Sequence, residues 1–202
     1  MFHFFQIILT PIFRFFFPTK FVGKKNMPEG PCIIASNHTS NMDAINLVVH
    51  TWEKKYFLAK KELFKNKLVG FFMRKWGGIK IDRQGNDVNA IKESLRVLKN
   101  GKKLVIFPEG TRNHNENMEM GEVKQGVAMF AIKAKVEIVP MFIMKKPKIW
   151  RRNRVVIGQP FDLSQFYGKK LSTEELSEAT SIVATKMEEL REQTLNSLTK
   201  KK

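Results

Sequence analysis

The chain has 202 residues, a length that suits one domain, and no long Pro, Gly or Ser linker divides it in two. Its 36 lysines and arginines against 19 acidic residues give a net charge of +17, which calls for an anionic partner such as nucleic acid or an anionic lipid surface. The single cysteine, Cys32, excludes an internal disulfide framework and indicates a reducing compartment.

Phenylalanines gather at the N-terminus, where the first 21 residues hold eight of the chain's 17. The segment is interrupted by Pro11, is too short for a spanning helix of ~20 apolar residues, and lacks the features of a cleaved signal. Such rings beside cations are typical of a segment in the lipid interface, although a hydrophobic helix packed on the domain is the alternative. We predict an anchor over residues 1–22 and a domain over residues 23–202, with membrane contacts from Phe4, Phe5, Phe13, Arg14, Phe16 and Phe17.

After this segment, apolar runs of strand length alternate with helical patterns. We expect strands at residues 32–35, 56–59, 79–81, 103–107, 138–143 and 154–158. We expect helices from 42 to about 52, from 63 to 72, from 88 to 98, from 126 to 134, and from 172 onward. This rhythm predicts a single-domain α/β fold, with a central, mostly parallel or mixed sheet flanked by helices.

The turn after the first of these strands holds a histidine and an aspartate with four residues between them, in the sequence Asn-His-Thr-Ser-Asn-Met-Asp over residues 37–43. Imidazole can take a proton from an alcohol near neutral pH when a carboxylate orients it, so His38 is a candidate general base and Asp43 its partner. The same stretch fits a capping box, in which Asp43 only satisfies the helix start after Ser40. Both interpretations stay open at this point.

A second polar turn follows another buried strand. Residues 104–112 read Leu-Val-Ile-Phe-Pro-Glu-Gly-Thr-Arg, which places a carboxylate and a guanidinium directly after the strand. Because open α/β sheets bind ligands at the carboxyl ends of their strands, both turns are expected to contribute to one site.

The two turns together resemble the glycerophospholipid acyltransferases of the lysophosphatidic acid acyltransferase type. The resemblance extends to Lys60-Lys61-Glu62-Leu63, to the Gly-Ile-Lys-Ile-Asp-Arg block at 78–83 and to Ile138-Val139-Pro140, and it covers about residues 20 to 160. It implies transfer of a fatty acyl group from coenzyme A or acyl carrier protein to the free hydroxyl of lysophosphatidic acid, giving phosphatidic acid. The hydroxyl then belongs to the substrate, so direct transfer needs no covalent enzyme intermediate, whereas Ser40 or Cys32 would be the nucleophile of a covalent route.

The resemblance also implies how the acceptor is held. The acceptor phosphate would be bound by the second turn, where Arg112 is the cation that can donate to two oxygens. Glu109 would fix this turn, and Gly110 and Thr111 lie between them. Arg83 and Lys60 are added to the same anion site, with plain surface charge as the alternative for both. The segment from 63 to 76 lacks the proline that relatives have, which leaves open another lysophospholipid, glycerol-3-phosphate or an aminoacyl lipid as acceptor.

The remaining expectations concern partners. Aromatic residues gather at the N-terminus instead of alternating with the cations along a groove, so we expect membrane lipids and no nucleic acid as partner. A metal site could be imagined from His38, Asp43, His114 and Glu109, but their spacing in the sequence matches no metal-binding pattern. We therefore expect no metal, and no cofactor beyond acyl-CoA or acyl carrier protein as co-substrate. We expect the protein to be peripheral or monotopic on the cytoplasmic face of the cell membrane; a non-catalytic membrane adaptor of the same fold is the alternative.

Overall fold

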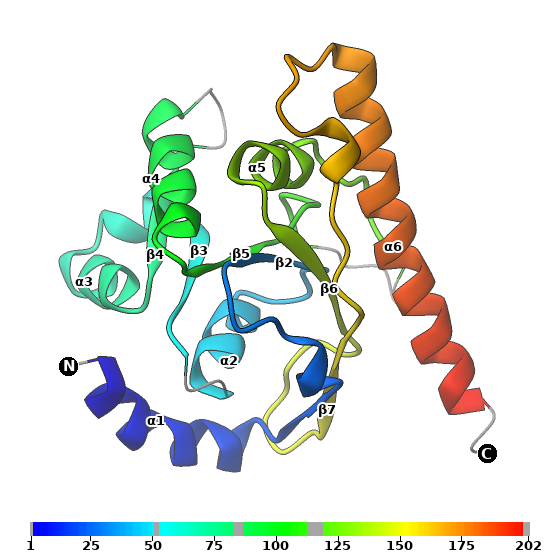
Figure 1. Cartoon of the computed structure of the whole chain (residues 1–202). Coiled ribbons are helices and arrows are strands. Elements are labelled where there is room, and N and C mark those ends of the chain that lie inside the picture. The colour runs from blue at the N-terminus through cyan, green and yellow to red at the C-terminus, as the bar shows by residue number, and fades with distance from the viewer. Residues whose placement is uncertain (1, 51–52, 83–86, 113–118, 200–202) are drawn as a thin grey trace.

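The fold is built around one seven-stranded sheet (Figure 1). The computed structural model describes residues 2–50, 53–82, 87–112 and 119–199, apart from the side chains of residues 2–5, 8, 9 and 48. The strands are β1 (Thr19–Val22), β2 (Cys32–Ser36), β3 (Lys55–Lys60), β4 (Gly78–Ile81), β5 (Lys103–Ile106), β6 (Glu137–Ile143) and β7 (Asn153–Ile157). Their order across the sheet is β1-β7-β6-β2-β5-β3-β4.

Most of the sheet is parallel. The neighbours from β6 through β2, β5 and β3 to β4 all pair in parallel, while β7 is antiparallel to β6 and β1 is parallel to β7. The carboxyl ends of five strands therefore lie at the same edge, which is where the two polar turns of the sequence begin. The predicted fold class, one α/β domain with a mostly parallel mixed sheet, is confirmed.

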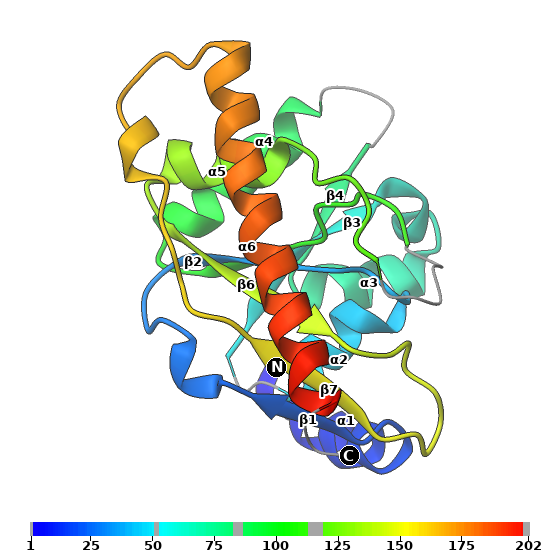
Figure 2. The same cartoon turned by 90° about the vertical axis from the view of Figure 1, so that its right-hand side faces the viewer.

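Helices cover both faces of the sheet. Helices α4 (Val88–Lys99), α5 (Gly126–Ala134) and α6 (Thr173–Thr199) lie on one face, and α1 (Phe2–Phe16), α2 (Met42–His50) and α3 (Lys67–Lys75) lie on the other (Figures 1 and 2). Short 3-10 turns occupy Lys24–Asn26, Lys61–Phe64 and Ser164–Phe166. No helix in the described part of the chain has the length and apolarity to cross a bilayer.

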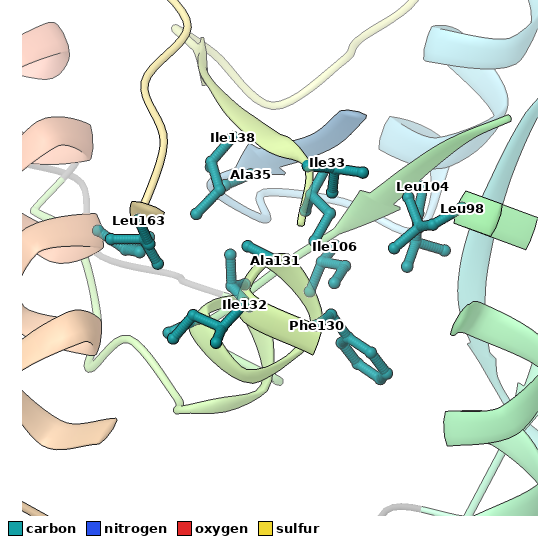
Figure 3. Packing of buried hydrophobic residues seen from close by; sticks show 14 of the residues in the cluster. Ile33, Ala35, Leu98, Leu104, Ile106, Phe130, Ala131, Ile132, Ile138 and Leu163 are labelled. Atoms are coloured by element: carbon teal, nitrogen blue, oxygen red, sulfur yellow. The ribbon is translucent and has the colours of Figure 1, made fainter. Parts of the chain in front are cut away.

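Strand β2 explains why two covering layers are needed. All five of its residues are buried, and alternate side chains point to opposite faces. Ile33 and Ala35 pack with Ile106, Ile138 and residues of α4, α5 and α6, the cluster drawn in Figure 3. Cys32 and Ile34 pack on the other face among Leu47 of α2 and Met73 of α3. The polar turn that follows β2 is thereby fixed to the rigid centre of the molecule.

Several helix ends follow from local sequence. The Asp87 carboxylate accepts a hydrogen bond of 3.0 Å from the backbone N–H of Ala90 and so caps α4. At the start of α6, Ser172 N–H donates to Glu175 Oε2 and Glu175 N–H donates to Ser172 Oγ, at 2.9 and 3.1 Å, which is a reciprocal capping box. These interactions satisfy backbone donors that have no partner within the helix.

Two elements differ from the sequence-based expectation. The helix predicted from residue 63 is a 3-10 turn followed by α3, because the Asn66 side chain accepts from the N–H groups of Leu68 and Val69 and starts a new helix there. Strand β1 lies inside the segment predicted as an anchor and pairs with β7, with Thr19 opposite Asn153. The N-terminal segment is therefore tied into the sheet at the edge beyond β7.

Candidate active site

The two polar turns meet because their strands are neighbours. Strands β2 and β5 pair in parallel, with Ala35 opposite Ile106, so His38 and Glu109 emerge side by side at the carboxyl edge. The backbone N–H of His38 donates to Glu109 Oε1 at 3.2 Å, across 71 residues of sequence. The predicted convergence of the two turns is thus present in the structure.

His38 is held by Asp43 in the geometry of an oriented base. Its Nδ1 lies 3.0 Å from Asp43 Oδ2, and the Asp43 side chain is completely buried. In the neutral imidazole this contact places the proton on Nδ1, because a carboxylate only accepts. The lone pair that can take a proton is then on Nε2.

Asp43 also caps the helix, so the geometry is compatible with both interpretations of the motif. Its Oδ2 accepts from the N–H groups of Thr39 and Ser40 at 2.6 and 2.7 Å, and Thr39 Oγ1 donates to Oδ1 at 3.1 Å. Ser40 Oγ in turn accepts from Met42 N–H at 3.2 Å. A carboxylate that receives this many donors has little rotational freedom, which fixes the imidazole that it holds.

The imidazole is fixed from a second side by Phe107, which sequence reasoning did not single out. The rings of His38 and Phe107 stack with their centroids 4.2 Å apart and an angle of 22° between their planes. Phe107 follows β5 directly and precedes the proline and glutamate of the second turn. An aromatic residue at a strand end gave no signal of this contact, because the stacking partner lies in the turn after a different strand.

Glu109 connects three loops. Its carboxylate is buried and accepts from His38 N–H and, through Oε2, from Gly121 N–H at 3.1 Å. A Cβ at Gly121 would lie only 2.8 Å from that oxygen, so glycine allows the close approach. The geometry makes Glu109 a positioning residue for the histidine turn.

Cations surround the same edge. Thr111 and Arg112 are exposed just after Gly110, whose φ of +67° suits glycine. The Lys124 side chain lies over this glycine, since a Cβ there would lie 3.0 Å from Lys124 Nζ. Lys60 is exposed at the end of β3.

Two further cations, Lys61 and Arg83, are not part of the anion site in the described structure. Lys61 forms an ion pair of 2.5 Å with Asp82, and the hydrogen bond that its ammonium donates to the Asp82 carboxylate raises the pKa of Lys61. Arg83, which was predicted to join the anion site, lies outside the described residues. The cations that the described structure places around the second turn are therefore Arg112, Lys124 and Lys60.

A largely apolar cavity lies beside Phe107, the residue whose ring stacks on His38. It has a volume of about 340 Å³ and lies between the sheet and helices α4 and α5, with Phe107, Pro108 and Gly110 at its rim. Three charged residues, Asp82, Asp87 and Lys124, line it as well, and its apolar walls include Leu58, Ile91, Ile106, Met129 and Phe130. A pocket of this size with few polar groups is typical of a site for a small or chain-like apolar ligand.

The opposite edge carries a different set of groups. Lys55 and Lys103 are buried and share the Glu53 carboxylate, at 3.6 and 2.6 Å. Burial lowers the pKa of Lys55, and Glu53 partly offsets that effect. Burial also raises the pKa of the nearby Cys32 thiol to about 12, so this cysteine is a poor nucleophile.

Helix α1 places the residues that were predicted to contact lipid as follows. Arg14 and Phe16 are exposed, whereas Phe13 and Phe17 are half-buried with ring centroids 5.6 Å apart. The side chains of Phe4 and Phe5 lie outside the described set. The described residues contain no group of three or more His, Cys, Asp or Glu side chains placed to hold a metal ion. His114, which was considered as a ligand, lies outside the described residues.

Comparison of the sequence with models of known protein families identifies the class of protein to which this chain belongs. A family model described as Acyltransferase matches residues 18–144, which include both polar turns. The chain belongs to this acyltransferase family.

Particular relatives narrow the comparison. The chain is 33% identical to the 1-acyl-sn-glycerol-3-phosphate acyltransferase of Streptococcus pneumoniae, over 80% of this chain and 61% of that protein. It is 30% identical to the enzyme of the same name from Bacillus subtilis, over 85% of this chain and 87% of that protein. The crystal structure of the 1-acyl-sn-glycerophosphate acyltransferase PlsC from Thermotoga maritima superposes with a TM-score of 0.65 at 28% identity, covering 87% of this chain and 72% of that one. The family resemblance inferred from the two motifs is confirmed.

Proposed function

We propose that the chain transfers a fatty acyl group from an acyl thioester to the free hydroxyl of lysophosphatidic acid, giving phosphatidic acid. The observation that carries the proposal is the contact between His38 Nδ1 and the buried Asp43 carboxylate, beside a cavity that can take an acyl chain. The names of the pneumococcal and Bacillus relatives supply the acceptor class.

In the proposed step His38 Nε2 accepts the proton of the acceptor hydroxyl as its oxygen attacks the thioester carbonyl carbon. The new C–O bond forms and the C–S bond breaks, so that the sulfur leaves as a thiol once the imidazolium returns its proton. Asp43 stabilises the imidazolium by accepting from Nδ1, in the manner of the aspartate of a hydrolase triad. The base thus begins and ends each turnover neutral.

Direct transfer is favoured over a covalent enzyme intermediate. Cys32 is fully buried with its pKa raised to about 12, and it begins β2 whereas His38 follows the other end of that strand. Ser40 is buried, and its hydroxyl already accepts from the backbone N–H of Met42. Neither residue is placed as an activated nucleophile beside the base.

The acceptor phosphate is assigned to the cations at the rim. Arg112 can donate to two phosphate oxygens at once, and Lys124 adds a point charge over Gly110. Glu109 supports this arrangement indirectly by holding the histidine turn and the loop at Gly121. Lys60 adds to the positive field at the same edge.

An acyl chain is assigned to the cavity beside Phe107. Its walls are mostly apolar, and Phe107 connects it to His38 through the stacked rings. The variant Met129→Trp, which fills part of this cavity, is expected to shorten the longest chain that is transferred. A chain-length profile equal to that of the wild type would place the acyl chain elsewhere.

Membrane association is assigned to α1 because its polar side chains face the protein and its apolar side chains face solvent. A helix that only packs on a domain has the opposite arrangement. Gln6 and Thr10, at 5% and 7% exposure, face the protein, where Thr10 Oγ1 donates to Val49 O at 3.0 Å. Ile7, Ile12 and Phe15 face outward, and Phe15 is 68% exposed. An outward apolar face beside cations suits a lipid interface, and the anionic cytoplasmic leaflet suits the charge.

The proposal is tested by thiol release from a long-chain acyl-coenzyme A with lysophosphatidic acid in vesicles, with the product identified by mass spectrometry. His38→Ala is expected to lower the rate at least ~10²-fold while leaving the circular dichroism spectrum and vesicle binding intact. Acyl carrier protein and glycerol-3-phosphate serve as alternative donor and acceptor. Equal rates for the variant and the wild type would refute His38 as the base, and thiol release with none of these pairs would favour a non-catalytic adaptor.

A further inference from the structure

The loop between β6 and β7 emerges beside the candidate base. Asn37, the residue before His38, donates from Nδ2 to Ile143 O at 3.0 Å and accepts from Ile143 N–H through Oδ1 at 2.7 Å. Ile143 is the last residue of β6, so residues 144–152 leave the sheet next to the histidine turn. This stretch is called the β6–β7 loop below.

The loop is strongly cationic. Residues 144–152 contain three lysines and two arginines, and no acidic residue occurs anywhere from 138 to 161. Residues 1–28 likewise contain four cations and no acidic residue. Strand β1 pairs with β7, so the two segments lie side by side and bring their positive charges to one edge of the sheet.

The tip of the loop presents apolar side chains to solvent. Ile149 and Trp150 are both exposed, Trp150 to 69%. The Trp150 ring stacks on Phe16 of α1 with centroids 6.4 Å apart and an angle of 21° between the planes, and Trp150 N–H donates to Phe16 O at 2.7 Å. The outward apolar face of α1 is therefore continuous with the loop.

The loop is held in this position by its own contacts. Asn153, which is buried, donates to Lys145 O at 2.6 Å and accepts from Lys145 N–H at 3.1 Å, closing the base of the loop. Arg151 donates to Lys146 O. Trp150 has φ of +57°, a conformation rare for a bulky residue, and its bond to Phe16 maintains it. The exposed tryptophan is thus positioned before any partner arrives.

A hollow of about 420 Å³ lies between α1 and the loop, with Pro18, Thr19 and Asn153 at its floor and Arg14, Lys20 and Arg152 around it. No ion pair involving these three cations occurs within the described residues. Two guanidinium groups and an ammonium around one depression are the donors that a phosphate monoanion or dianion prefers. The stacked rings of Phe16 and Trp150, each two residues before a residue that lines the hollow, are typical of side chains at headgroup depth.

We propose that the β6–β7 loop is a second lipid-binding element: Ile149 and Trp150 insert beside α1 into an anionic bilayer, and the hollow holds the phosphate of an anionic phospholipid headgroup. The inference rests on the proposed function at a membrane. It adds the class of lipid, an anionic phospholipid, and a second membrane contact besides α1. Because the loop starts at the residue that Asn37 holds, its insertion places the His38 edge against the bilayer surface, where a lipid acceptor presents its hydroxyl.

The first test uses Ile149→Cys labelled with an environment-sensitive fluorophore, since Cys32 is fully buried and does not compete for the label. The label is expected to report an apolar environment with vesicles containing phosphatidylglycerol and little change with phosphatidylcholine alone. Lys170→Cys is the control, because the turn before α6 lies at the opposite end of the molecule from α1 (Figures 1 and 2). An aqueous environment at position 149 on anionic vesicles overturns the proposal, as does a response to RNA or to acyl carrier protein in place of vesicles.

The second test measures vesicle affinity. Lys145→Gln with Lys146→Gln is expected to weaken binding roughly 30-fold, because each cation near an anionic surface contributes about fivefold. Lys169→Gln with Lys170→Gln, in the distant turn, is the matched control and is expected to weaken binding less than about threefold. Equal effects of the two pairs overturn the assignment to this loop.

Acyl transfer distinguishes this proposal from the proposed function. The Lys145→Gln, Lys146→Gln protein is expected to lose activity on vesicle-embedded lysophosphatidic acid and to keep it on a short-chain acceptor dissolved in water. Loss on both acceptors overturns a purely membrane role for the loop. Insertion of the label without acyl transfer by the wild type refutes the proposed function and leaves the lipid-binding surface standing.

Discussion

Asp43→Asn separates the two tasks that the structure gives to one carboxylate. Asparagine has the same shape, and its amide oxygen can still accept from the N–H groups of Thr39 and Ser40. Because the same atom, Oδ2, also faces His38 Nδ1, the amide oxygen takes that place too, and the amide nitrogen takes the place of Oδ1 beside Thr39 Oγ1. The imidazole keeps its proton on Nδ1, but a neutral amide oxygen stabilises the imidazolium that forms during transfer much less than a carboxylate does.

The expected loss of activity is large and the loss of stability moderate. In hydrolase triads the same exchange lowers kcat about 10⁴-fold because the histidine takes the wrong tautomer; here the tautomer is kept and only the charge is lost, so we expect a smaller loss of about 10²- to 10³-fold. Two charge-assisted hydrogen bonds of 2.6 and 2.7 Å become neutral ones. At about 1 kcal/mol for each, the free energy of unfolding should fall by about 1 to 3 kcal/mol.

The assay is steady-state thiol release, with urea denaturation measured on the same preparations. Glu175→Gln is the matched control because Glu175 has the same capping role at α6 and no contact with His38. It is expected to lose a similar or smaller free energy of unfolding with kcat unchanged. An Asp43→Asn protein that retains more than a tenth of the wild-type kcat would show that Asp43 is only a helix cap.

Three further predictions concern other residues. Arg112→Gln and Lys124→Met should each raise KM for lysophosphatidic acid about tenfold or more with little change in kcat, as expected for phosphate binding, and a pure kcat effect in steady-state kinetics would contradict this. Glu53→Gln should lower stability by roughly 2 kcal/mol, a value reduced because the carboxylate is 43% exposed. The pKa of Lys55 is lowered in the folded protein, so the unfolded chain binds more protons below the usual lysine pKa and stability rises with pH; the variant should lose more at pH 6 than at pH 9 in urea titrations. Cys32 should resist iodoacetamide until the protein unfolds, because its thiol is buried with a pKa of about 12, and rapid alkylation of the native protein would refute that burial.

Much of the fold was predictable because it depends on short-range patterns. The runs at 32–35 and 138–143 are apolar throughout, as strands buried on both faces must be. The cap at Asp87 and the box at Ser172 and Glu175 form between residues three apart. In each case the sequence window contains all the groups that interact.

The assignment of lipid contacts to the N-terminal segment stays a prediction, yet the structure adds what the sequence could not contain. Composition indicated a hydrophobic, cationic segment but not which side of α1 would face the protein. That side carries Gln6 and Thr10, because Thr10 meets a backbone carbonyl of α2. Strand β1 was not predicted, since a four-residue edge strand depends on its partner β7, more than a hundred residues away.

The sequence by itself determined the alternating strands and helices, the motif with its two compatible interpretations, and an excess of positive charge. Only the tertiary structure decided that Glu109 and Phe107 hold the histidine, that Lys124 lies over Gly110, and that Trp150 stacks on Phe16. The physical reason is the separation along the chain between the residues that interact. Helix caps and strand periodicity are set by neighbours within a few residues, whereas these contacts exist only because strand pairing and core packing bring distant turns to one edge of the sheet.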